Sequence, residues 1–324
     1  MLKYAYYIES NNYNPHQNLA LEEALFDSLP KDSIIFYLWQ NAHTVVIGKN
    51  QNAHKECALD KMEEDQCTLA RRSTGGGAVY HDLGNLNFSF ITNENNHSLE
   101  QQSSVILDCL KQLGICAYLS GRNDIEVDEK KISGNAYLTR DQKKLHHGTL
   151  MIDVNTEIMR KYLRPSNLKL HAKGVDSIRS RVANIKEFNP LITIPLIKEQ
   201  LKKSFEMIYQ LPLLALEIPK NYSDYYHHYQ SKEFIFGELS NYTHYLEHRF
   251  DFGEVNLYYT LKDNRVIHVL AYSDAMDLSI VPDIHLFFEG LLLDEIYFTE
   301  KYQINPKPYL EELYLMMKEN KNDL

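Results

Sequence analysis

Three consecutive glycines at positions 75–77 are the feature that most constrains how this chain folds. Residues without side chains accept positive φ angles, and they let backbone N–H groups approach a ligand closely. Arg71 and Arg72 come just before the glycines, and their forked guanidinium groups suit phosphate or carboxylate oxygens. We interpret the segment as an anion-binding loop. The alternative is a flexible turn beside a surface arginine pair.

The glycine run does not match the common nucleotide-binding motifs. No Gly-Lys-Ser/Thr follows it, so it is not a Walker loop. The Gly-x-Gly-x-x-Gly order of dinucleotide-binding folds is also missing.

Composition narrows the protein class. The chain has 324 residues, 44% of them hydrophobic, which is typical of a globular protein. Its 34 basic and 44 acidic residues give a formal net charge of −10, which disfavours a nucleic-acid partner. The acidity is concentrated after residue 247, whereas residues 160–186 are locally basic.

The cysteines and the lack of long apolar runs indicate in which cellular compartment the protein is found. Four cysteines without paired spacing fit neither a disulfide scaffold nor a zinc ribbon, so we interpret them as thiols of a reducing compartment. No signal-peptide pattern or membrane-spanning apolar run is visible. We expect a cytoplasmic monomer without a membrane partner.

Strand and helix patterns are mixed without the regular alternation of a doubly wound sheet, which indicates an α+β fold. We expect strands near residues 33–39, 44–47, 86–90, 124–127, 132–137, 149–152, 249–261 and 265–272. We expect helices near residues 16–29, 55–65, 106–113, 197–208, 283–293 and 308–318. The strand at 86–90 alternates apolar and polar residues, which predicts one buried face. Residues 222–245 have no clear period, so we predict two domains, 1–243 and 247–324.

A predicted hairpin brings Asp124 and Lys131 to neighbouring strands. Small residues surround the lysine, so its charge can point into a ligand cavity and stabilise developing negative charge. The alternative is a pair of solvated turn lysines.

Two further segments contain residues that could bind a metal ion or an anion. His146 and His147 are adjacent on a strand and so point to opposite faces, which makes them a poor metal pair. Residues 173–184 carry basic residues on both sides of a glycine, as in a loop that closes on an anion or in a solvated basic face.

These segments, in this order, resemble the lipoate–protein ligase A family of the biotin/lipoate ligase superfamily. The resemblance rests on the arginine pair with its glycines and on the motifs Gly-Arg-Asn-Asp at 121–124, Lys131 with Ser133-Gly134-x-Ala136-Tyr137, His-Gly-Thr-Leu at 147–150, Lys-Gly at 173–174 and residues 38–48. It covers nearly the whole chain, with a weaker match for the accessory domain after residue 249. It implies a mixed or antiparallel sheet flanked by helices, with a small α+β C-terminal domain.

The resemblance also implies a reaction. Lipoate and Mg-ATP would give lipoyl-AMP and pyrophosphate, and a lysine of an apo lipoyl domain of E2 subunits, or of the glycine-cleavage H protein, would then attack the adenylate. Lys131 would be catalytic and would bridge the carboxylate and α-phosphate. The residues implied to bind ATP and lipoyl-AMP are Arg72, Gly75, Gly76, Gly77, Ala78, Val79, Tyr80, Asn123, Asp124 and Lys131. Those implied for lipoate are Ser73, Lys131, His147 and Gly148, with Asp124 also a candidate Mg²⁺ contact.

One position departs from the family pattern. An arginine that follows the Ala-Tyr pair in some members is Leu138 here, with Arg140 two residues later. We expect the acyl tail to occupy an apolar slot near Val45 and Ala78-Val79.

Three alternatives remain. An acyl transferase that works without ATP needs a cysteine nucleophile near residues 121–124, where this chain has Arg-Asn-Asp and only Cys116 upstream. A biotin ligase would need a Gly-Arg-Gly-Arg loop, and only Gly121-Arg122 is present. A protein that binds lipoyl-AMP without catalysis is the third alternative.

Overall fold

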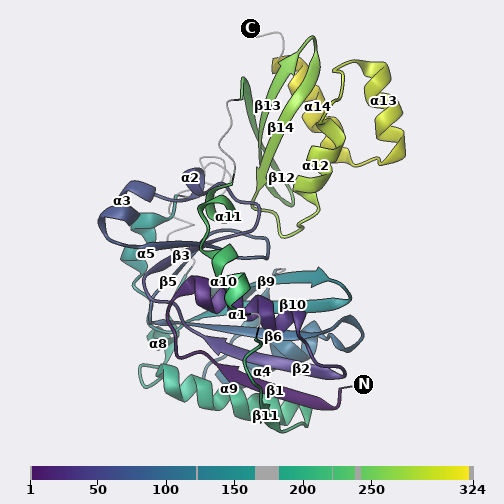
Figure 1. Ribbon diagram of the computed structural model, residues 1–324. Helices are drawn as coiled ribbons and strands as arrows, with labels where there is room; N and C mark the ends of the chain where they lie inside the picture. The colour runs from purple at the N-terminus through teal and green to yellow at the C-terminus, as the bar shows by residue number, and fades with distance from the viewer. Residues whose placement is uncertain (1, 122, 165–181, 221, 238–241, 321–324) are drawn as a thin grey trace. The chain divides into compact units, whose positions relative to one another are not determined.

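The computed structural model describes residues 2–121, 123–164, 182–220, 222–237 and 242–320 (Figure 1). The chain divides into two compact units. The first comprises Met1–Ile47, Ala53–Ser73 and Ala78–Phe236, and the second comprises Gly48–Asn52, Thr74–Gly77 and Gly237–Leu324. The glycine run therefore belongs to the second unit. Within the described ranges, no helix has the length and apolarity to cross a membrane.

An eight-stranded mixed sheet organises the first unit, with strand order β11-β1-β2-β6-β10-β9-β8-β7. The strands are β1 (Tyr4–Glu9), β2 (Ser33–Trp39), β6 (Asn85–Asn93), β7 (Tyr118–Ser120), β8 (Asp124–Val127), β9 (Lys130–Arg140), β10 (Lys143–Met151) and β11 (Leu213–Ala215). β1 pairs in parallel with β2 and β11, and the other neighbours pair antiparallel. The predicted α+β fold with a mixed sheet is confirmed.

Helices cover both faces of this sheet. Figure 1 shows α4 (Leu99–Gln112) and α9 (Ile194–Tyr209) along one face, and α1 (Pro15–Asp27) with α10 (Tyr222–Tyr229) on the other. α1 begins one residue before the helix predicted at 16–29. The Asn14 side chain accepts hydrogen bonds from the backbone N–H groups of His16 and Gln17, and Pro15 occupies the first turn.

An aromatic stack forms the centre of the face under α4 and α9. Phe36 stacks on Phe90 with ring centroids 4.9 Å apart and on Phe205 with centroids 5.1 Å apart. All three side chains are fully buried. The stack ties two strands to α9, so it fixes that helix on the sheet.

The opposite face of the sheet is also buried, but it is polar. The prediction that the strand at 86–90 has only one buried face is wrong, because Asn87 is 2% exposed and Ser89 is fully buried. Their side chains lie under α1, where each makes a hydrogen bond with a buried partner. The polar residues that alternate with apolar ones in β6 therefore belong to a buried polar face and do not contact solvent.

A second, three-stranded sheet completes the first unit. Its strands are β3 (Thr44–Ile47), β4 (Thr68–Arg71) and β5 (Val79–His81), in the order β4-β3-β5. The short helices are α2 (Ala53–Glu56), α3 (Leu59–Glu64), η1 (Glu94–Asn96), α5 (Thr156–Tyr162), α8 (Ile185–Phe188) and α11 (Lys232–Phe236). Val45 is fully buried in a core cluster with Tyr80 and Tyr162.

The second unit contains a three-stranded antiparallel sheet and three helices. They are β12 (His244–Phe250), β13 (Gly253–Lys262), β14 (Arg265–Ser273), α12 (Ile280–Phe288), α13 (Glu295–Ile304) and α14 (Pro308–Asn320). The predicted turn between the last two strands contains Asp263 and Asn264, both with positive φ, as in a tight hairpin turn. The sequence patterns did not predict the strands β1, β4, β5, β7 and β11, most of β12, or the helices η1, α5, α8, α10, α11 and α13. The single helix expected at 55–65 is two short helices.

We predict that Phe205→Ala lowers the free energy of unfolding of the first unit by about 3–5 kcal/mol, because it leaves a cavity in the aromatic stack. Met207, on the same helix, is 56% exposed, and Met207→Ala is expected to change stability by less than about 0.5 kcal/mol. The measurement is denaturant unfolding followed by fluorescence of Trp39, the only tryptophan. Equal losses for the two variants would contradict the account of the core.

Candidate functional site

Two rows of side chains cross the sheet beneath α1. The strand register aligns Trp39 on β2 with Asn87 on β6, and Asn87 with Thr149 on β10. The Gly134 N–H on β9 donates to the Thr149 hydroxyl over 3.2 Å, which continues this row. Cross-strand partners share a face of the sheet, so this row ends in glycine on the β9 side and in tryptophan on the β2 side.

The second row comprises Tyr37, Ser89, His147 and Ala136, from the same four strands. Ala136 lies beside Gly134 and Thr149, so the side chains on that side of His147 are small, whereas the Leu138–Leu145 pair lies on its other side. Small residues on a sheet face leave space for a ligand.

A buried carboxylate on α1 connects these rows. Glu22 is 2% exposed, and it accepts a hydrogen bond of 2.5 Å from the Ser89 hydroxyl. Both of its oxygens lie 3.0 Å from Nδ1 of His147. The Trp39 indole N–H donates to Ser89 over 3.0 Å. Glu22, Trp39 and Ser89 were not among the residues predicted, and their only sequence signal was the polar alternation of β6.

The predicted pairing of Asp124 with Lys131 is confirmed. The Lys131 ammonium lies 2.7 Å from a carboxylate oxygen of Asp124, and both side chains are about one-third exposed. A Cβ atom at position 134 would lie 2.8 Å from the Lys131 nitrogen, so the lysine side chain passes directly over Gly134. Glycine is needed there because this close approach leaves no room for a side chain.

Neighbouring backbone holds this lysine segment. The Lys131 carbonyl accepts a hydrogen bond from Ala183 over 3.0 Å. The Asn123 carbonyl accepts from the backbone and the side chain of Asn135, over 2.8 and 3.0 Å. Residues 173–181 of the predicted basic loop, and Arg122, lie outside the described residues.

The two arginines have different roles. Arg72 is 7% exposed, its side chain donates to the Val46 carbonyl, and burial lowers its pKa to about 10 against the opposing effect of Glu22. Arg71 donates to the carbonyls of Phe234 and Ile235 in α11. Arg71 therefore anchors α11, whereas the buried Arg72 side chain is held against the backbone of β3.

Within the second unit, the glycine run packs closely against other backbone. A Cβ atom on Gly75 would lie 2.5 Å from the Ala275 carbonyl oxygen. The Gly76 N–H donates to that same carbonyl over 3.1 Å, and Gly76 has a φ of 89°. A Cβ on Gly77 would meet no atom within 4 Å. Close packing and positive φ therefore explain the first two glycines in this structure.

The remaining predicted residues fall into two groups. Ala78 and Val79 are partly exposed at the start of β5, and Ser73 is also partly exposed. Tyr80 and Gly148 have packing partners, since the Tyr80 hydroxyl lies 3.0 Å from His43 and a Cβ at 148 would lie 2.5 Å from the Phe88 ring.

The two adjacent histidines point to opposite faces, as predicted. His147 faces Glu22 under α1, whereas His146 lies among Gln102, Asn135 and the Phe88 ring on the other face. No group of three or more His, Cys, Asp or Glu side chains suited to a metal ion occurs within the described ranges.

The arginine displaced from the family pattern has partners on α1. The Arg140 guanidinium lies 2.7 Å from Glu23 and 2.6 Å from Asp27, and it sits over the Phe26 ring. Leu138 is 9% exposed. Arg140 therefore ties the end of β9 to α1.

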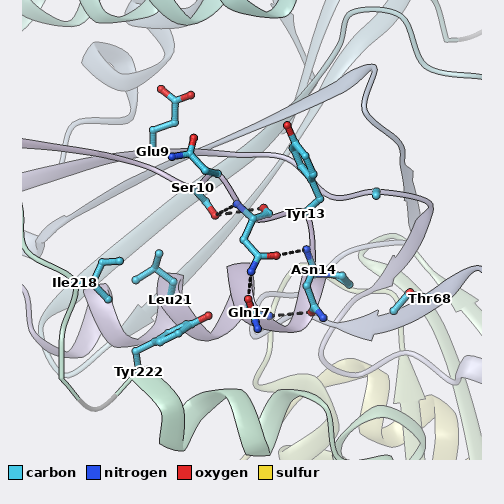
Figure 2. Close-up of a pocket in the computed structure, with 13 residues that line it drawn as sticks. Glu9, Ser10, Tyr13, Asn14, Gln17, Leu21, Thr68, Ile218 and Tyr222 are labelled. Atoms are coloured by element: carbon cyan, nitrogen blue, oxygen red, sulfur yellow. Dashed lines mark hydrogen bonds between the residues drawn. The ribbon is translucent and has the colours of Figure 1, made fainter.

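A groove of about 960 Å³ lies beside the N-terminal end of α1 (Figure 2). Figure 2 shows its wall of Ser10, Asn14 and Gln17, with Tyr222 and Ile218 opposite. The groove contains none of the predicted site residues. Its connection to the α1 face is Ser10, whose hydroxyl donates to the buried Asn18 over 2.6 Å.

Comparison with known proteins places these features in a family. Residues 14–206 match the model for the lipoyl protein ligase A/B catalytic domain. Lipoate-protein ligase A of Psychrobacter cryohalolentis is 39% identical over 280 residues, 83% of each chain. Lipoate-protein ligase A of Bdellovibrio bacteriovorus is 35% identical over 286 residues, 85% of this chain and 84% of the relative.

Solved structures agree. LipL1 of P. falciparum, crystallised with lipoate, superposes with a TM-score of 0.84 and 29% identity, over 97% of this chain and 99% of that one. A lipoate-protein ligase A bound with ATP gives a TM-score of 0.64 and 27% identity, over 74% and 100% of the two chains. A bipartite ligase of Thermoplasma acidophilum, studied with its E2 lipoyl domain, gives 0.65 and 28%, over 75% and 99%.

We predict that His81 makes the first unit less stable in acid. The His81 side chain is 3% exposed, and burial, with Arg72 and His147 nearby, lowers its pKa to about 3. The unfolded chain binds a proton there below about pH 6.5, so stability is present above that pH and is lost as the pH falls. At about pH 5 the loss from His81 is about 2 kcal/mol.

The measurement compares unfolding of the wild type and His81→Gln from about pH 8 to about pH 5 by Trp39 fluorescence. The variant should lose about 2 kcal/mol less than the wild type over this range. The control, His227→Gln, alters an exposed histidine on α10 and should follow the wild type. A wild-type profile parallel to that of His81→Gln would show that His81 is not buried in its neutral form.

Proposed function

The chain belongs to the lipoate–protein ligase A family, and on that premise we propose that it attaches lipoate to proteins in two steps, the first of which consumes ATP. In the first step a lipoate carboxylate oxygen attacks the α-phosphorus of ATP and pyrophosphate leaves, giving lipoyl-AMP. In the second step the amine of an acceptor lysine attacks the acyl carbon, and AMP leaves. The observation that carries the proposal is the Lys131–Asp124 pair lying over Gly134 at the end of the α1 face.

Lys131 is the proposed catalytic residue. Its ammonium would contact the lipoate carboxylate and the α-phosphate, where negative charge accumulates during attack and departure of pyrophosphate. Asp124 holds the lysine in place before substrate binds, and the partial exposure of both side chains leaves them accessible. Asn123, next to Asp124, is proposed to contact the nucleotide.

We propose that Arg72 and the backbone of Gly75, Gly76, Gly77, Ala78, Val79 and Tyr80 bind the phosphates of ATP and then lipoyl-AMP. The open space at Gly77 and the partial exposure of Ala78 and Val79 support this for the second half of the segment. The Gly76 N–H already donates to Ala275, so its contribution requires that this hydrogen bond be exchanged for one to phosphate.

The acyl chain is proposed to lie on the α1 face, along the small residues between Lys131 and His147. Ser73 and His147 are the proposed lipoate contacts at its edges, and Gly148 contributes by letting Phe88 pack beneath the strand. Val45, expected near the slot, packs in the core cluster of the three-stranded sheet.

Mg²⁺ would accompany ATP. Magnesium in nucleotide sites is held mainly by phosphates and water with one or two carboxylates, so a single carboxylate suffices. Asp124 fits this donor set, as a partly exposed carboxylate paired with Lys131.

The acceptor is proposed to be an apo lipoyl domain of an E2 subunit or the H protein. We propose that residues 1–243 form the catalytic domain and 247–324 an accessory domain of a cytoplasmic monomer. All four cysteines are free thiols, in keeping with a reducing compartment.

We predict that Lys131→Ala lowers ATP-dependent lipoylation by at least about 10²-fold, because charge stabilisation in the transition state is lost. The fold should remain, since the lysine is not part of a core cluster. Lys130→Ala is the matched control. Lys130 is the adjacent residue and its nearest ion-pair partner, Glu187, is 3.9 Å away, so this variant should keep wild-type activity.

The assay mixes protein, lipoate, Mg-ATP and an apo lipoyl domain, and it measures pyrophosphate release and the mass gain on one acceptor lysine. Transfer from an acylated donor protein without ATP, and none from free lipoate, would establish the transferase alternative. Release of no pyrophosphate with tight lipoyl-AMP binding would establish the non-catalytic alternative.

A further inference from the structure

His81, at the end of β5, has one ring nitrogen that the proposed chemistry does not use. The side chain is 3% exposed, and its Nδ1 lies 3.2 Å from the side-chain nitrogen of Asn41. Among the described residues, its Nε2 has no hydrogen-bond partner. A buried polar atom without a partner is uncommon and costs stability, so it requires an explanation.

A chain of hydrogen bonds fixes which ring nitrogen carries the proton. Asn18 accepts hydrogen bonds at Oδ1 from Ser10 over 2.6 Å and from Tyr37 over 3.2 Å. Its Nδ2 donates to the backbone carbonyl of Gln40 over 2.8 Å and to Oδ1 of Asn41 over 2.9 Å. The backbone carbonyl can only accept, so the orientation of the Asn18 amide is determined.

The orientation of Asn41 in turn determines the tautomer of the His81 imidazole. Because Asn41 accepts from Asn18 at Oδ1, its Nδ2 faces His81 and donates to Nδ1. A neutral imidazole that accepts at one nitrogen carries its proton on the other. His81 therefore presents an N–H donor at Nε2, fully desolvated and without an acceptor.

This donor lies at the far end of the proposed acyl slot from Lys131. The His81 ring meets Trp39 edge-to-face with centroids 6.3 Å apart. Trp39 stands on β2, three strands from Gly134 on β9. Three inter-strand spacings amount to about 14 Å, so a carboxylate at Lys131 does not reach His81, whereas the terminal ring of an extended lipoyl chain points toward it.

We propose that the Nε2–H of His81 donates a hydrogen bond to a sulfur of the dithiolane ring, and that Asn18 and Asn41 are positioning residues that hold the required tautomer. This inference rests on the function proposed above and names how that site recognises its substrate class. Sulfur in a ring is a weak acceptor, and octanoate has a methyl group in its place. A site with a buried donor disfavours a substrate that leaves the donor unpaired.

The test is the ratio of kcat/KM for lipoate to kcat/KM for octanoate, in the ATP-dependent assay with an apo lipoyl domain. His81→Leu removes the donor and should lower this ratio by about three- to tenfold. His81→Gln keeps a side-chain N–H and should hold the ratio within about twofold of the wild type. A purely structural role would lower both rate constants together and leave the ratio unchanged.

Asn41→Ala tests the positioning role without altering the imidazole. It should lower the ratio toward that of His81→Leu, because Nδ1 no longer receives a hydrogen bond. Nitrogen-15 NMR of histidine-labelled protein should show the Nε2–H tautomer in the wild type and a mixture in Asn41→Ala. If His81→Leu does not fold, Asn41→Ala still gives both readouts and His81→Gln still gives the kinetic ratio.

The outcomes separate the two proposals. A wild type that acylates neither substrate with ATP overturns the function proposed above, and this inference with it. A wild type that acylates, with a ratio unchanged in His81→Leu or Asn41→Ala, overturns this inference alone. An Nδ1–H tautomer in the wild type also overturns it, whatever the activity.

Discussion

The buried carboxylate of Glu22 is the interaction on which the α1 face depends. An unpaired carboxylate at 2% exposure would be strongly unfavourable, and here it is stabilised by the Ser89 hydroxyl and the His147 ring. Those partners stand on adjacent strands, so one side chain from α1 links the helix to β6 and β10. The polar side chains on this face of the sheet can remain buried because they have hydrogen-bond partners within the protein.

The strand register arranges the residues of the candidate site on the face that Glu22 keeps buried. Cross-strand alignment puts Gly134 and Ala136 opposite Thr149 and His147, so the face narrows to small side chains where Lys131 passes over. The same strand register gives the α1 face a charged end at Lys131. Its other end, at Trp39, is polar but buried. A substrate with a carboxylate at one end and a ring at the other would therefore contact different kinds of side chain at its two ends.

Sequence patterns predicted the site residues whose partners are close to them in the sequence. The Asp124–Lys131 pair followed from a hairpin, and the opposite orientation of His146 and His147 followed from strand alternation. Glu22 and Asn41 were missed, because their partners are distant in sequence and only tertiary packing unites them. The prediction of a single buried face for β6 was wrong, because alternation marks a polar face but does not say whether a helix covers that face.

The most direct test of the central claim is a crystal structure of the protein with lipoate. The account predicts the carboxylate within hydrogen-bond distance of the Lys131 ammonium and the chain along Gly134, Ala136 and His147, with the dithiolane ring beside Trp39 and His81. Lipoate bound instead in the groove beside Ser10 and Gln17, or with its carboxylate at the Trp39 end, would contradict it.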